Sequence, residues 1–82
     1  MDRKEVFCQL KQIAEKSGFD TTDVSEKSSL QDDLKMDSLD SVGFLMECEQ
    51  HFQVSLPLIV IEHITTVGDL IDAVHHEVMK QN

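Results

Sequence analysis

Three stretches of this 82-residue chain repeat apolar side chains at the spacing of an amphipathic helix. In the first stretch the apolar positions are Val6, Leu10 and Ile13, and polar Lys and Gln residues fill most of the opposite side. A period of 3.6 residues is typical of a helix that buries one face. The chain has only three Gly and one Pro, too few turn signals for a β-sandwich or a β-barrel. The sequence therefore predicts an all-α fold.

The same pattern gives the expected bounds of the helices. The three main helices are predicted from Asp2 to Ser17, from Ser38 to about Phe52 and from Val67 to about Lys80. A short fourth helix is expected to begin with Pro57 at its first position and to continue through Leu58–Ile61. Residues 19–36 form a long connection rich in Ser, Thr and Asp. We therefore predict a small four-helix bundle of three main helices and one short one, with a long loop between helices one and two.

Composition limits the classes of function. Residues 1–82 are expected to form a single domain, whose formal charge of −9 comes from 16 acidic and 7 basic side chains. Such a chain should avoid nucleic acid and be attracted to basic patches on protein partners. No apolar run has the length of a transmembrane segment, and the N-terminus lacks the apolar region of a signal peptide. Two cysteines do not make a disulfide framework. We expect a cytoplasmic monomer.

Ser38 occupies a chemically distinctive place at the start of the second main helix. Asp37 is suited to be the N-cap, and Asp40 then falls at the third helical position, as in a capping box. A phosphate ester on Ser38 would lie beside free N–H groups and the positive end of the helix dipole. Asp37 and Asp40 would repel a free phosphate, so the site favours a covalently carried phosphate. An ordinary exposed serine at a helix start is the alternative that local chemistry leaves open.

The motifs Asp32-Asp33-Leu34, Asp37-Ser38-Leu39-Asp40 and Glu62–Val67 stand at spacings that resemble the acyl carrier protein family. The resemblance covers nearly the whole chain. It implies that a phosphopantetheinyl transferase attaches phosphopantetheine from coenzyme A to Ser38. The terminal thiol of this arm would then hold acyl chains as thioesters. By the same resemblance, acyl-transferring and chain-elongating enzymes of fatty-acid biosynthesis, with basic docking patches, are the expected partners.

Three departures from the family's usual pattern stand out. Lys35 replaces a common glycine just before the motif, so a left-handed backbone there would be mildly strained. Gly43 stands inside a helix at a position where the family usually has an acidic residue. Leu58–Ile61 is apolar where many members are acidic, and Leu58 or Ile59 is expected to be exposed or to line an acyl pocket.

The second main helix has two expected faces. Leu39, Leu45, Cys48 and Phe52 are predicted to form a buried stripe, with Phe44 beside it. Val42 and Met46 follow Ser38 at four-residue steps, so they are expected on an exposed row that docks partners. The acidic rim of this docking surface would consist of Asp37, Asp40, Glu47 and Glu49. Given the resemblance, a cleft between helices that shelters the acyl chain is expected to be lined by Phe44, Leu45, Cys48, Ile61, Ile64 and Leu70.

Other chemistries lack the residues they require. Cys48 and His51 have no second pair of ligands to complete a zinc site, and the acidic residues around Ser38 lack the EF-hand pattern. No histidine lies near Ser38 in sequence to act as a base, so the chain is not expected to be an enzyme. Two alternatives stay open: a carrier of polyketide, aminoacyl or peptidyl cargo, and a helical protein-interaction module that is never modified.

Overall fold

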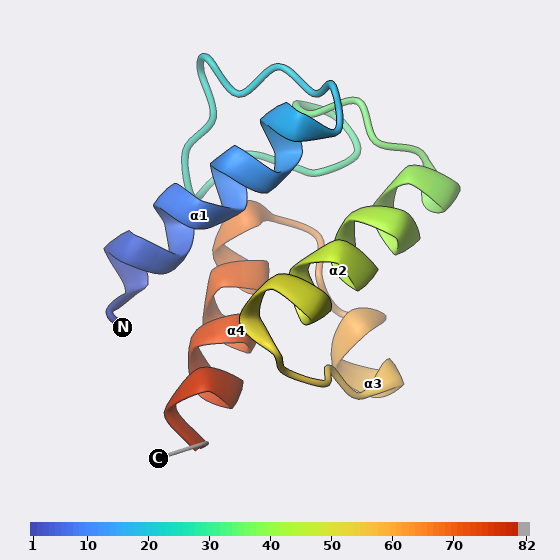
Figure 1. Ribbon diagram of the computed structural model, residues 1–82. Helices are drawn as coiled ribbons and strands as arrows, with labels where there is room; N and C mark the ends of the chain where they lie inside the picture. The colour runs from blue at the N-terminus through green and yellow to red at the C-terminus, as the bar shows by residue number, and fades with distance from the viewer. Residues whose placement is uncertain (81–82) are drawn as a thin grey trace.

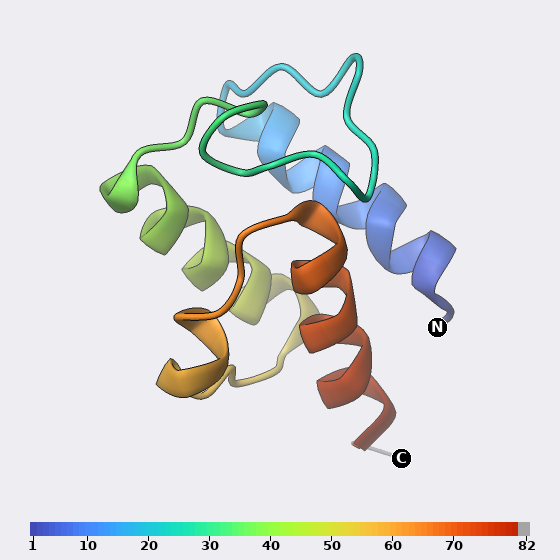
Figure 2. The ribbon, with the colours of Figure 1, turned by 180° about the vertical axis from the view of Figure 1, so that it is seen from behind.

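The computed structural model describes residues 1–80 and shows four helices around one apolar core. They are α1 (Arg3–Lys16), α2 (Ser38–Phe52), α3 (Leu58–Ile61) and α4 (Val67–Lys80). Figure 1 shows α1 crossing in front of α4, with α2 beside them and the short α3 at the lower end. The view from behind in Figure 2 shows the α1–α2 connection covering the opposite end of the bundle. The predicted all-α bundle of three main helices and one short helix is confirmed.

Local side-chain caps place the helix ends close to their predicted positions. The Asp2 carboxylate accepts a hydrogen bond from the Glu5 N–H (2.9 Å), so Asp2 precedes α1 as its N-cap. At α4, the Asp69 N–H donates to Thr66 Oγ1 and the Thr66 N–H donates to Asp69 Oδ2, each at 3.1 Å. These reciprocal bonds satisfy backbone donors that a helix start would leave free.

The start of α3 differs by one residue from the sequence prediction. Pro57 has φ −60° and ψ 147°, which is an extended conformation, and it is the N-cap rather than the first helical residue. The ring of proline fixes φ but leaves ψ free, so a helical φ alone did not place Pro57 inside the helix. The first helical residue is therefore Leu58.

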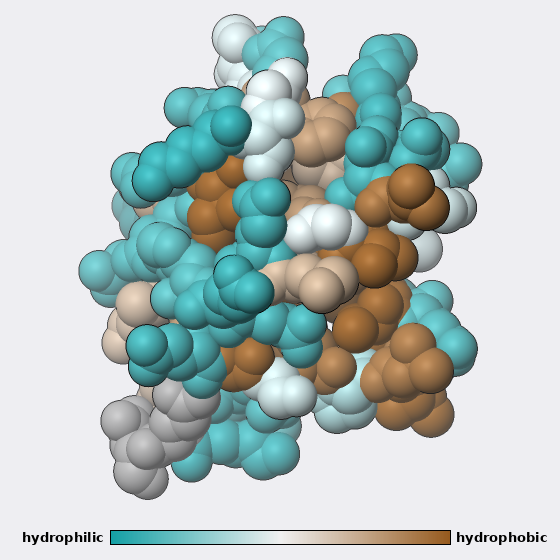
Figure 3. Space-filling view, turned by 45° about the vertical axis from the view of Figure 1, so that its right-hand side comes forward, coloured by the Kyte–Doolittle hydropathy of each residue, from teal (hydrophilic) through white to brown (hydrophobic). Residues whose placement is uncertain are grey.

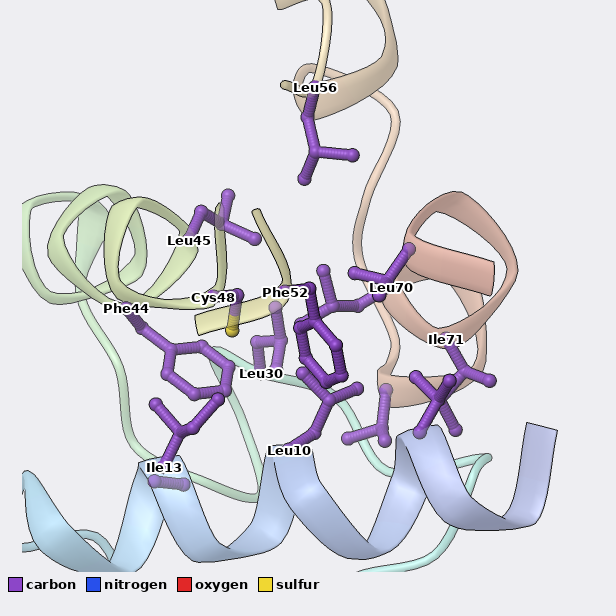
Figure 4. Close-up of a cluster of buried hydrophobic side chains, with 14 of the residues drawn as sticks. Leu10, Ile13, Leu30, Phe44, Leu45, Cys48, Phe52, Leu56, Leu70 and Ile71 are labelled. Atoms are coloured by element: carbon purple, nitrogen blue, oxygen red, sulfur yellow. The ribbon is translucent and has the colours of Figure 1, made fainter. Parts of the chain in front are cut away.

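The core is built from the apolar faces of all three long helices. Figure 4 shows Phe44, Leu45, Cys48 and Phe52 of α2 directed toward side chains of α1 and α4. Leu39, which we predicted to be buried with them, is 83% exposed, and this prediction is wrong. Leu39 lies five residues before Phe44, about 1.4 helical turns, so it points away from the core side of α2.

The long α1–α2 connection is held against the bundle by both apolar and polar contacts. Leu30, Leu34 and Met36 are buried in the core. The Arg3 guanidinium joins the connection to α4, because it forms ion pairs with both Glu26 and Asp72. Backbone bonds add to this attachment: Gly68 N–H donates to Glu26 O (2.8 Å), Val67 N–H to Ser28 O (2.9 Å) and Leu30 N–H to Thr65 O (3.0 Å). These contacts therefore hold in place the part of the connection that leads into α2.

The glycine inside α2 offers a first test of this fold. Gly43 is exposed, and a Cβ added to it would meet nothing within 4 Å. We expect Gly43→Ala to raise the free energy of unfolding by about 1 kcal/mol, because alanine loses less backbone entropy in a helix. Urea denaturation followed by circular dichroism measures this change, and the Tm should rise by about 4–8 °C. Gly68→Ala is the comparison, since its Cβ would lie 3.0 Å from Glu26 O, a backbone atom that also accepts from the Gly68 N–H (2.8 Å), so this variant should not reach the stability of Gly43→Ala. A Gly43→Ala protein no more stable than wild type would contradict the placement of Gly43.

The two cysteines should differ sharply in reactivity. Cys8 is exposed, whereas Cys48 has no exposed surface, and burial, with Glu47 and Glu49 nearby, raises the pKa of its thiol to about 12. At about pH 8 only about one Cys48 thiol in 10,000 is then ionised, and only the thiolate reacts with iodoacetamide. The test uses a Ser38→Ala protein, so that no thiol of an arm on Ser38 is alkylated as well. Mass spectrometry should show one alkylation on the folded chain and a second one only in urea. Equal labelling of both cysteines in the folded protein would be the contrary result.

Candidate functional site

Ser38 is exposed as the first residue of α2, and the residues around it fix the helix start at this position. The Asp40 N–H donates to Asp37 Oδ1 (2.8 Å), and the Asp37 N–H donates to Asp40 Oδ2 (3.3 Å). The Ser41 N–H donates to the Asp37 carbonyl (2.9 Å) and closes the first turn. The predicted capping box is therefore present, and it fixes the helix start at Ser38.

The first turn of α2 keeps two donors for a group attached to Ser38. Within residues 1–80, the N–H groups of Ser38 and Leu39 have no hydrogen-bond partner, whereas those of Asp40 and Ser41 are satisfied. Free N–H groups and the helix dipole stabilise negative charge at this end. A phosphate ester on Ser38 thus fits the residues present.

The Ser38 hydroxyl is accessible but not activated. In the described part of the chain, Ser38 Oγ has no hydrogen bond to a histidine, lysine or carboxylate that would act as its base. A serine nucleophile of a hydrolase needs such a base within hydrogen-bond reach. The geometry therefore allows Ser38 to receive a group when another protein supplies the base.

An exposed apolar row follows Ser38 along α2. Val42 and Met46 are 53% and 55% exposed, and Leu39 joins them with 83% of its surface exposed. Leu39 therefore adds an apolar side chain to the predicted row, between Ser38 and Val42. A helical-wheel count from Phe44 would have found Leu39, because residues 39, 42 and 46 share one side of a helix.

The apolar row continues onto the neighbouring helix. Leu58 and Ile59 of α3 are 70% and 68% exposed, as expected for at least one of them. Figure 3 shows apolar side chains gathered in a band along the side of the molecule formed by α2 and α3. We call this band, made of Leu39, Val42, Met46, Leu58 and Ile59, the apolar band.

The acidic residues expected at the rim do not all lie in equivalent places. Asp37 and Asp40 are exposed at the same end of α2 as Ser38. Glu47 is exposed but accepts a hydrogen bond from Ser17 Oγ (2.9 Å), which turns it toward the end of α1. Glu49 is half-buried, and its Oε2 accepts from the Leu56 N–H (2.8 Å). The structure thus brings Asp37 and Asp40 to Ser38 and engages Glu47 and Glu49 elsewhere.

The six residues expected to line an acyl cleft fall into two groups. Phe44, Leu45, Cys48 and Leu70 are buried in the core, whereas Ile61 and Ile64 are half-buried and pack against it. Phe44 and Leu70 border a hollow of about 10 Å³, which is about the space for one water molecule. Ile64 lines an open groove between α3 and α4 instead. An acyl chain would enter the core only if the helices moved apart.

The described residues contain neither a metal-ligand cluster nor a helix that could span a membrane. Within residues 1–80, no three His, Cys, Asp or Glu side chains are placed to hold a metal ion. Over the same range, none of the helices has both the length and the apolar character needed to cross a bilayer.

Comparisons with known proteins agree with this geometry. The family model described as "phosphopantetheine attachment site" matches residues 10–74. The acyl carrier protein of Rubrobacter xylanophilus is 39% identical over 75 residues, covering 90% of this chain and 93% of the relative. That of Thermotoga maritima is 43% identical over 70 residues, covering 84% and 86%.

Solved structures show the same similarity. The crystal structure of an acyl carrier protein from Thermotoga maritima superposes with a TM-score of 0.89 and 31% identity, covering 100% of this chain and 96% of that one. The acyl carrier protein from Enterococcus faecalis gives a TM-score of 0.75 and 27% identity, covering 94% and 99%. The matched region includes the whole start of α2 described above. The chain therefore belongs to the acyl carrier proteins, which carry acyl groups on a covalently attached phosphopantetheine.

Proposed function

We propose that Ser38 is the attachment residue for phosphopantetheine and that the thiol of this arm holds acyl chains as thioesters. The supporting observation is the exposed Ser38 hydroxyl beside the free N–H groups of Ser38 and Leu39. In the attachment step, Ser38 Oγ forms a bond to the phosphorus that bears the pantetheine. The pyrophosphate bond of coenzyme A breaks, and the adenosine bisphosphate leaves.

The carrier works through other proteins and catalyses no step itself. The phosphopantetheinyl transferase must supply the base for Ser38, because no side chain among residues 1–80 that could act as a base is hydrogen-bonded to Ser38 Oγ. The loaded protein then acts as a cytoplasmic monomer that meets acyl-transferring and chain-elongating enzymes in succession. Names of the bacterial relatives support acyl cargo over aminoacyl or peptidyl cargo.

Partner enzymes dock on the start of α2 and the apolar band. Asp37 and Asp40 attract basic side chains at the edge of the contact, while Val42 and Met46 supply apolar area at its centre. Glu47 and Glu49 contribute to the negative potential around this surface. Attraction between exposed charges mainly speeds association, and salt should weaken it.

The helices of the bundle move apart to admit the acyl chain, which is then sheltered from water in the core. Phe44, Leu45 and Cys48 of α2 face Leu70 of α4 across the core (Figure 4). Ile61 and Ile64 are partly buried and pack against this core. An acyl chain that enters here replaces contacts that these side chains make with one another. The apolar area that the chain buries, at about 25 cal/mol per Å², offsets the loss of those contacts.

Loss of the Ser38 hydroxyl tests the attachment site. Wild type, Ser38→Ala and the control Ser41→Ala are incubated with coenzyme A and a phosphopantetheinyl transferase, and each intact mass is measured. We expect wild type and Ser41→Ala to gain one phosphopantetheine and Ser38→Ala to gain none. Because Ser38 is exposed, circular dichroism should show unchanged helix content. A mass gain on Ser38→Ala would refute attachment at this residue.

The apolar part of α3 offers a test of docking. Leu58→Glu/Ile59→Glu should leave the Tm nearly unchanged, since both side chains are largely exposed. We expect kcat/KM for acyl transfer by cognate enzymes to fall about tenfold, because roughly 1.4 kcal/mol of apolar contact is lost on docking. Met79→Glu on α4 is the matched control, for Met79 is 50% exposed and lies outside the apolar band. Unchanged kcat/KM with all cognate enzymes would exclude a docking role for α3.

A further inference from the structure

Lys35, three residues before Ser38, has a backbone conformation that its side chain disfavours. Its φ is +61°, in the left-handed region, which glycine adopts without strain and lysine does not. The side chain does not contribute to the core, because Lys35 is exposed. Backbone strain that packing does not require often accompanies a functional role. The Lys35 side chain is therefore a candidate for such a role.

The Lys35 ammonium has no partner in the described part of the chain. Within residues 1–80, the ion pairs join Arg3 to Glu26, Arg3 to Asp72 and Lys80 to Glu77, and none involves Lys35. This is notable because several carboxylates lie within five residues of it, namely Asp32, Asp33, Asp37 and Asp40. The Lys35 ammonium is therefore available to another anion.

No other basic side chain lies as near to Ser38 in sequence as Lys35 does. It is the only Lys or Arg between residues 28 and 79. Three residues of chain span at most about 11 Å, and both the lysine side chain and a phosphate on Ser38 extend beyond the backbone. The ammonium of lysine is a compact charge with three donors, which suits a phosphate oxygen.

Some of the carboxylates near Lys35 in the α1–α2 connection already accept hydrogen bonds. Lys35 borders a surface hollow together with Asp20, Asp23 and Asp33. Asp20 accepts hydrogen bonds from Thr22 Oγ1 (2.7 Å) and the Thr22 N–H (2.9 Å), which lower the pKa of Asp20. Asp33 accepts from the Ser29 N–H (2.7 Å). Lys35 itself lines this hollow and precedes Asp37, the N-cap of α2, by two residues.

We propose that Lys35 is a positioning residue whose ammonium pairs with the phosphodiester that joins Ser38 to its arm. This inference rests on the proposed attachment of phosphopantetheine at Ser38. Lys35 offsets the repulsion that Asp37 and Asp40 exert on the phosphate, and it acts together with the free N–H groups of Ser38 and Leu39. The pairing draws the first part of the arm toward the α1–α2 connection. Leu39, Val42 and Met46 then stay uncovered for a docking enzyme.

The test compares Lys35→Gln, which removes the charge, with Lys35→Arg, which keeps it. Lys27→Gln is the matched control, because it removes one positive charge from the same connection, eleven residues before Ser38. Each protein is loaded with coenzyme A and a phosphopantetheinyl transferase, and its intact mass shows whether the arm is present. The ³¹P NMR signal of the phosphodiester is then followed from about 0.01 M to about 1 M NaCl, over which the Debye length falls from about 30 Å to about 3 Å.

We expect the ³¹P signal of wild type, Lys35→Arg and Lys27→Gln to move with salt as the ion pair is screened. The signal of Lys35→Gln should start near the high-salt position of wild type, lose most of its salt response and relax more slowly, as a freer phosphate does. Equal shifts and equal salt responses in wild type and Lys35→Gln would overturn the role of Lys35 while leaving attachment intact. If wild type gains no mass, attachment at Ser38 fails, and the Lys35 proposal falls with it.

Discussion

The reciprocal hydrogen bonds between Asp37 and Asp40 determine how the rest of α2 is used. They set the residue at which the helix begins, and the period of 3.6 residues then assigns every later side chain to a face. Phe44 and Cys48 reach the core, whereas Val42 and Met46 remain outside. With the helix start at Ser38, the period of 3.6 residues also places Ser38, Val42 and Met46 along one side of the helix. The same cap therefore positions Ser38, the buried side chains and the exposed apolar row of α2.

Most of the fold follows from local signals that a sequence displays directly. The bounds of α1, α2 and α4 were predicted to within one residue, because Asp2, Asp37 and Thr66 cap their own helices through neighbours three residues away. Leu39 was assigned to the wrong face because it was grouped with the other apolar residues of α2 without counting turns back from Phe44. Its exposure is the clearest example of spacing outweighing residue type.

Contacts between distant parts of the chain could not be predicted in this way. Nothing near Arg3 in sequence indicates that it pairs with Glu26 and Asp72. Likewise, Glu49 was expected at the docking rim because it is acidic and on α2, yet it accepts a bond from Leu56 after the chain has turned. Ser38 stood out from the pattern of residues around it, but only the hydrogen bonds of residues 1–80 show that its N–H and that of Leu39 have no partner there.

The tight interior has a consequence for the lifetime of the cargo. Under the proposed sheltering of the acyl chain, the resting bundle and the occupied bundle are two distinct conformational states, because the hollow beside Phe44 and Leu70 holds only about 10 Å³. The time that a thioester spends hidden from water thus depends on how readily the helices separate. A partner that binds the resting bundle more tightly than the occupied one would favour release of the cargo into its own active site. Delivery would then need no dedicated signal, only a shift in the balance between two packings of the same helices.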